Sequence, residues 1–159
     1  VVSDVENDIL KITVVDRYRE SQPAVSFIKN FGLKSGAIAS CVGHDSHNII
    51  AVGVDDNSLA AVVNEVIKHK GGVAIMVDGK VEVLPLPVAG IMSNEDGWVV
   101  AQKYDKLNKL PKLIGCHLHS PYMTLSFMAL LVIPALKLGD KGLFDGQKFE
   151  FVDLFVENS

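Results

Sequence analysis

Apolar runs separated by polar, turn-forming residues extend along most of the chain. Residues 8–15 alternate in part between polar and apolar positions, which predicts a strand with one buried face. Residues 37–42 and 49–54 are almost wholly apolar and predict two buried strands, and residues 24–31 are compatible with a short helix or a strand. Strands therefore dominate the first third of the sequence.

Two segments carry helix signals. The polar residues 55–58 supply capping side chains before an apolar stripe with helical spacing, and Gly71 follows the last periodic residue, which predicts a helix ending near Lys70. A second cap at Ser93 predicts another helix over residues 93–110.

A hairpin is the clearest local pattern. Residues 73–77 and 80–84 are strand-like segments joined by an Asp-Gly pair, which favours a tight turn. Residues 123–132 are apolar throughout and fit a buried helix or a buried strand, while residues 148–156 predict a final strand. Without strict alternation of strands and helices, and with no interdomain linker, the sequence predicts a single α+β domain over residues 1–159, with a mixed β-sheet and about two to four packing helices.

The composition of the chain indicates which kinds of partner it can bind. Apolar residues make up 48% of the 159 residues, which predicts an apolar face for a second copy or another domain. The net charge of −4 and the absence of long basic runs argue against nucleic acid, and no apolar run is long enough to cross a membrane. Cys41 and Cys116 predict reduced thiols in a cytoplasmic protein, and a start at Val1 fits a piece of a longer protein.

The residues His44, Asp45, Ser46, His47 and Asn48 form the most distinctive polar cluster, and they lie between two predicted buried strands. Loops fixed by strands often carry binding or catalytic residues. One histidine next to a carboxylate can act as a general base, and two histidines can bind a metal. The alternative is a turn in which Asp45, Ser46 and Asn48 bond the local backbone. We expect these side chains to point together.

Two other candidates are weaker. His117 and His119 have the spacing of a metal-binding pair on a strand, but the (β/α)₈ barrel in which such pairs recruit further ligands needs about 250 residues. We therefore predict no metal site in this chain. Cys41 next to His44 suggests a nucleophile pair, but its apolar surroundings favour a small buried residue.

Several rare sequence words, in order, resemble the C-terminal domain of bacterial adenine deaminases. They include GAIAS at residues 36–40, HDSHNII at 44–50, LPLPVAGIMS at 84–93 and PYMTLSFMAL at 121–130, with DKGLF at 140–144. The resemblance covers nearly the whole chain, from residue 8 to residue 156.

The resemblance implies a parent enzyme of the amidohydrolase superfamily, a hydrolase of purine metabolism that converts adenine and water to hypoxanthine and ammonia. It also implies that the catalytic groups and a manganese or iron ion lie in an N-terminal barrel preceding this domain, so the isolated chain is expected to be inactive. On this basis His44 to Asn48 become candidates for contact with the purine at the rim of the active site.

Two departures from the family pattern affect that expectation. Residues 17–23 lack the His- and Gly-rich loop expected after the first strand, and His117 to Ser120 stand where acidic residues are expected. If the early loop touches substrate, a related amine or amide is the alternative substrate. A non-catalytic oligomerisation or cover domain and a stand-alone domain that binds a small ligand are the alternative functions.

Overall fold

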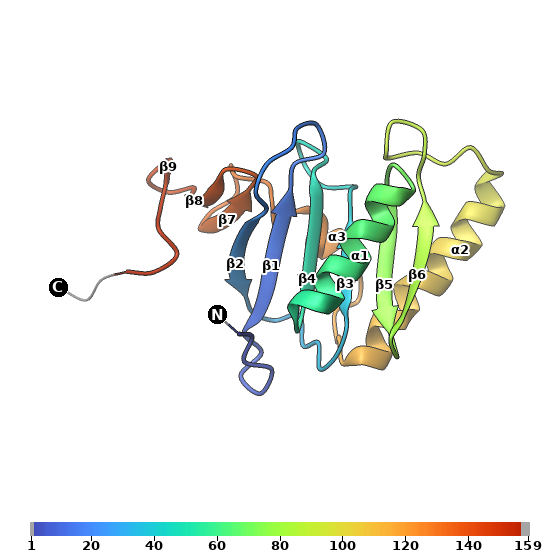
Figure 1. The fold of residues 1–159 in the computed structure, drawn as a ribbon, viewed down its shortest axis with the longest axis horizontal. Helices are drawn as coiled ribbons and strands as arrows, with labels where there is room; N and C mark the ends of the chain where they lie inside the picture. The colour runs from blue at the N-terminus through green and yellow to red at the C-terminus, as the bar shows by residue number, and fades with distance from the viewer. Residues whose placement is uncertain (1, 157–159) are drawn as a thin grey trace.

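The computed structural model describes residues 2–156. Its main feature is a six-stranded sheet with the strand order β2-β1-β4-β3-β5-β6 (Figure 1). The strands of this sheet are β1 (Leu10–Val15), β2 (Ala24–Ile28), β3 (Ala37–Ser40), β4 (Ile49–Gly53), β5 (Gly72–Val77) and β6 (Lys80–Pro85). A small second sheet near the C-terminus contains β7 (Leu136–Gly139), β8 (Gly142–Asp145) and β9 (Glu150–Phe151).

Helices cover both faces of the large sheet. Helix α1 (Asp56–Lys68) lies across one face, and α2 (Gly97–Lys109), η1 (Leu110–Ile114) and α3 (Pro121–Ser126) lie on the other (Figure 1). Apolar side chains on both faces of the central strands are buried, which explains why residues 37–42 and 49–54 show no alternation. The core therefore has two layers, one beneath α1 and a larger one beneath α2, η1 and α3.

The α+β class and the single domain are confirmed, but the expected mixed sheet is not found. Every strand pairing in the described part of the chain is antiparallel. The crossover through α1 joins β4 to β5, and β3 pairs antiparallel with both of them. Because β3 lies between these two parallel-running strands, the crossover creates no parallel pair.

Local predictions hold best where the pattern is strong. The hairpin of β5 and β6, helix α1 and the buried strands are confirmed, and residues 24–28 form a strand. Helix α2 begins at Gly97, because the Asp96 side chain rather than Ser93 caps its first turn. Near the C-terminus, β7 and β8 were not predicted, and only residues 150–151 of the expected final strand pair.

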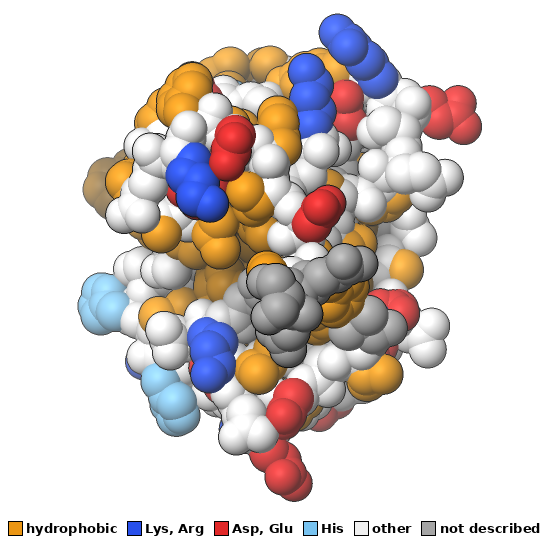
Figure 2. Space-filling view, turned by 90° about the vertical axis from the view of Figure 1, so that its left-hand side faces the viewer, with side chains coloured by type: hydrophobic (Ala, Val, Ile, Leu, Met, Phe, Trp, Pro, Cys, Tyr) orange, Lys and Arg blue, Asp and Glu red, His pale blue; other side chains and the backbone are white. Residues whose placement is uncertain are grey.

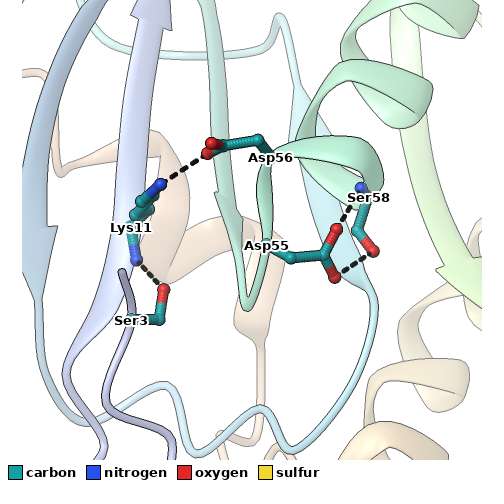
Figure 3. Close-up of polar contacts among 5 residues, drawn as sticks. All are labelled: Ser3, Lys11, Asp55, Asp56 and Ser58. Carbon is teal, nitrogen blue, oxygen red and sulfur yellow. Dashed lines mark hydrogen bonds and ion pairs between the residues drawn. The ribbon is translucent and has the colours of Figure 1, made fainter. Parts of the chain in front are cut away.

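Polar side chains hold the start of α1 in place (Figure 3). The Asp55 carboxylate accepts hydrogen bonds from the backbone N–H and the hydroxyl of Ser58, each at 2.8 Å. The N–H bond is the main cause that lowers the pKa of Asp55. One position later, Asp56 binds the ammonium of Lys11 at 2.6 Å, and the backbone N–H of Lys11 donates to Ser3 Oγ. This end of the helix therefore pairs its charged groups.

No helix in residues 2–156 combines the length and the apolar character needed to cross a bilayer. The longest helices, α1 and α2, have 13 residues each.

Candidate functional site

The segment His44 to Asn48 forms the loop between β3 and β4, as its place between two apolar strands predicts. His44, Asp45 and Ser46 are exposed, His47 is half-buried, and Asn48 is only 3% exposed. The five side chains therefore lie in different environments, and the polar cluster divides into an exposed tip and a buried base.

The buried base of the loop is structural. Asn48 Oδ1 accepts a hydrogen bond from the backbone N–H of Arg17 at 3.1 Å, and the Tyr18 hydroxyl donates to the carbonyl of Ser46 at 2.8 Å. The backbone N–H of His47 closes the turn by donating to Gly43 O at 2.8 Å. Asn48 thus bonds the backbone of a neighbouring segment rather than the local backbone of the turn, whereas Ser46 Oγ accepts the local N–H of Asn48 at 3.4 Å.

The two histidines of the loop contribute to different cavities. Their ring centroids lie 6.3 Å apart, and the His44 ring stacks at 4.9 Å on Phe127. His44 lines a cavity of about 410 Å³ beneath α2 and α3, whereas His47 lines a cavity of about 840 Å³ at the C-terminal end of α1. The expectation that all five side chains point together is therefore wrong for the histidines.

We call the larger of these two cavities the Arg17 cavity. Arg17 Nη2 donates to the carbonyl of Ala89 at 2.9 Å, but Arg17 Nη1 and His47 Nδ1 are buried without a hydrogen-bond partner among the described residues. Buried polar atoms without a partner are rare and call for a physical explanation. The cavity is lined by Asp16, Arg17, Tyr18, His47, Ile49, Val66, Ile67, Lys70, Gly71, Pro87, Ala89, Gly90 and Ile91.

We call the smaller one the Tyr122 cavity. Tyr122 is 3% exposed, its hydroxyl donates to the carbonyl of Ala74, and burial raises its pKa, so the phenol stays protonated. Apolar groups dominate the walls, which suits an apolar or aromatic occupant. The cavity is lined by Ser40, Val42, His44, Val73, Leu84, Leu86, Val100, Tyr104, Tyr122, Met123 and Ser126.

Cys41 is a small buried residue, as its apolar surroundings predict. Its side chain is 0% exposed, and its Sγ lies 2.7 Å from the carbonyl oxygen of Gly90 and 3.0 Å from the backbone nitrogen of Gly72. These contacts tie β3 to the glycine segments beside the Arg17 cavity.

His117 and His119 are both exposed, and His119 Nδ1 lies 3.0 Å from Ser120 Oγ. No group of three or more His, Cys, Asp or Glu side chains with metal-site geometry occurs among residues 2–156. The side chains present therefore do not fit the manganese or iron ion that the resemblance implies for the parent enzyme.

Arg17 was not predicted as a site residue, because the polar pattern after β1 is typical of a loop. The register in which β1 pairs with β4 shows why Arg17 belongs to the cavity. Val15 at the end of β1 pairs with Ile49 at the start of β4, so the residues that follow β1 lie beside those that precede β4. This pairing places Arg17 next to His47, although 30 positions separate the two residues in the sequence.

Comparison with known proteins decides the family. The profile described as the adenine deaminase C-terminal domain matches residues 1–150. The chain belongs to this family. It is 55% identical to an adenine deaminase of Methanosarcina mazei over 99% of the chain, 52% identical to one of Salinibacter ruber over 98%, and 48% identical to one of Borreliella burgdorferi over 95%. The matched segment covers only 28% to 29% of each relative, so the chain spans less than a third of their length.

Proposed function

We propose that this chain is the C-terminal domain of a longer, metal-dependent adenine deaminase of the cytoplasm, which hydrolyses adenine to hypoxanthine and ammonia. One observation carries the proposal: relatives 48–55% identical over nearly the whole chain are named adenine deaminases. A manganese or iron ion would activate water in the N-terminal barrel, outside this chain.

The domain is proposed to pack on that barrel and to bring its β3–β4 loop to the rim of the active site. Support comes from the exposed side chains of His44, Asp45 and Ser46, which stand at the tip of a loop whose base is fixed by Asn48. A fixed loop with free polar side chains is suited to contact a substrate held by another domain.

Exposed apolar side chains support a role in assembly as well. Val25, Leu136, Phe149, Phe151 and Phe155 are about half exposed or more, and they belong to the end of the molecule that carries β2 and the small sheet. Figure 2 shows hydrophobic side chains at the surface on this side. We propose that this face contacts the barrel or a second copy of the chain.

The activity is tested by ammonia release from the full-length protein loaded with manganese or iron. The proposed function predicts turnover of adenine by the full-length protein and none by the 159-residue chain. Full-length protein that turns over a different amine but not adenine would replace the substrate while keeping the reaction type.

The rim role is tested by histidine variants of the full-length protein. His44→Ala or His47→Ala should lower kcat or raise KM about tenfold or more while thermal unfolding stays unchanged, because a rim residue acts on bound substrate. His119→Ala is the matched control for His44→Ala, since both variants remove an exposed histidine. Wild-type kinetics in both loop variants would leave the domain with a cover or assembly role alone.

A further inference from the structure

The Arg17 cavity has the size and shape of a small-molecule site. Its volume of about 840 Å³ falls within the roughly 300–1,000 Å³ of typical ligand pockets. Four segments that are far apart in the sequence meet there: the residues after β1, the β3–β4 loop, the end of α1 and the loop after β6. Loops positioned by a sheet and a helix make a preformed pocket.

The polar lining of this cavity favours an anion. Arg17 and Lys70 carry two permanent positive charges, and Asp16 carries the one negative charge. Asp16 Oδ1 already accepts the backbone N–H of Tyr18 at 2.8 Å. The cavity lining therefore carries a net positive charge, and the nearby Glu65 is already in contact with Lys68 and His69, each at 3.0 Å.

Two buried nitrogens without a partner point to where the anion binds. Arg17 Nη2 is paired with Ala89 O, but Nη1 is buried and has no partner among the described residues, and the same holds for His47 Nδ1. A buried donor without an acceptor costs about 1–3 kcal/mol. A carboxylate or phosphate oxygen is the acceptor that a guanidinium binds most strongly.

Arg17 is held in its position by the backbone. Gly90 has φ +80°, and a Cβ at this residue would collide with Arg17 Nη1. The absence of a side chain at Gly90 is therefore what admits the guanidinium to the cavity. Such close approach of a charged group to a glycine is typical of binding sites that need backbone space.

The remaining lining is apolar. Ile67, Pro87 and Ile91 supply an accessible surface that an aromatic or aliphatic group can cover, whereas Ile49 and Val66 are fully buried beside it. An inorganic anion alone would leave this surface uncovered, whereas an anion attached to an apolar body would use both parts.

We propose that the Arg17 cavity binds a small molecule in which a carboxylate or phosphate is attached to an apolar or aromatic body. Its oxyanion accepts hydrogen bonds from the Arg17 guanidinium and from the His47 ring in its Nδ1–H tautomer, and its body covers Ile67, Pro87 and Ile91. Adenine carries no oxyanion, so this ligand differs from the substrate of the proposed deaminase, and the inference stands independently of that activity.

The test uses isothermal titration of the full-length protein at constant ionic strength with three probes: phenyl phosphate, inorganic phosphate and the neutral benzyl alcohol. Phenyl phosphate should bind more tightly than inorganic phosphate, and benzyl alcohol should bind least. Arg17→Met should weaken phenyl phosphate about tenfold or more, while Arg19→Met, an exposed arginine of the same loop, should leave the Kd within about twofold.

A second variant, Lys70→Met, tests the same cavity independently of Arg17. Lys70→Met at the exposed end of α1 should also weaken the phosphate probes, and it serves if Arg17→Met does not fold. Phenyl phosphate binding that neither variant weakens would place the ligand elsewhere, for example at the metal, and would overturn the proposal.

The same titration on the 159-residue chain distinguishes the source of the oxyanion. Binding to the chain but not to the full-length protein would show that a carboxylate of the longer polypeptide fills the cavity, and it would overturn a free ligand.

Discussion

The two ends of α1 differ in the contacts that their polar side chains make. At the N-terminal end, Asp56 pairs with the ammonium of Lys11, and Asp55 pairs with Ser58 (Figure 3). At the C-terminal end, the neighbouring Arg17 and His47 each keep a buried nitrogen without a partner in the described structure. Side-chain contacts occur at both ends, since Glu65 contacts Lys68 and His69 in the last turns of α1, but the second end also contains these two unpaired nitrogens.

Close backbone contacts add to the side-chain contacts at the second end. Gly71 follows the helix with φ +139°, and a Cβ there would collide with the backbone of Gly90. Two glycine segments in direct contact bring the loop after β6 against α1, and Arg17 Nη2 and Cys41 Sγ contact carbonyl oxygens of the same loop. Arg17 Nη1 and His47 Nδ1 nevertheless keep no partner among the described residues, which distinguishes this cluster from the fully paired one at the other end.

The largest expected effect comes from breaking the glycine contact. Gly71→Ala should destabilise the chain by about 2–4 kcal/mol, since it combines a disfavoured φ with a collision between backbone atoms. Urea unfolding of both proteins measures the difference. Gly97→Ala is the control, because no atom lies within 4 Å of its added Cβ, and it should be neutral or slightly stabilising. A loss below about 1 kcal/mol for Gly71→Ala would mean that the two segments separate easily.

The next effect breaks the charge pair at the other end. Asp56→Asn should cost about 1–2 kcal/mol, because it leaves the ammonium of Lys11, whose side chain is 11% exposed, without a charged partner. Lys11→Met should cost less, since it removes the buried charge itself and leaves Asp56, which is 79% exposed, to water. Thermal or urea unfolding gives both values, and the reverse order would show that the pair does not bury its charge.

A smaller and pH-dependent effect concerns the helix cap. Asp55→Ala should cost about 1 kcal/mol at pH 7, because it removes the acceptor of the Ser58 N–H. The lowered pKa of Asp55 means that its contribution is complete above the unfolded pKa of about 4 and is lost as the pH falls through the folded value. Unfolding of wild type and variant should therefore converge once the pH falls below the lowered pKa of Asp55. A difference that stays constant down to that pH would contradict a role for the carboxylate.

The sequence predicts the N-terminal end of α1 better than the C-terminal end. Asp55 and Ser58 are close in the chain, so their capping contact follows from local spacing. Arg17, His47 and Gly90 meet only through the sheet register and the loop after β6, and no local pattern encodes that contact. Capping and hairpin geometry are local properties of the chain, whereas a cavity is a property of the packed fold.

The β3–β4 loop shows the same limit within five residues. Its place between two buried strands follows from the apolar flanks, but the partition of its side chains does not. Asn48 is buried and accepts a hydrogen bond from the Arg17 backbone, His47 with its positive φ of 55° lines the Arg17 cavity, and His44 lines the Tyr122 cavity. Only the three-dimensional contacts separate the structural residue from the two cavity residues.

The smallest expected effect on stability is also the sharpest test of the comparison between the two ends. Arg17→Met in the 159-residue chain loses the hydrogen bonds of Nη2 to Ala89 O and to the Tyr18 hydroxyl, each worth about 0.5–1.5 kcal/mol, but it also removes the buried Nη1, whose unpaired state costs about 1–3 kcal/mol. These terms oppose each other, so the free energy of unfolding should change by less than about 1 kcal/mol, with an unchanged urea m-value. Arg19→Met, an exposed neighbour, should change it by less than about 0.5 kcal/mol. A loss above about 2 kcal/mol for Arg17→Met would make Arg17 a structural residue like Lys11, and the two ends of α1 would then be built alike.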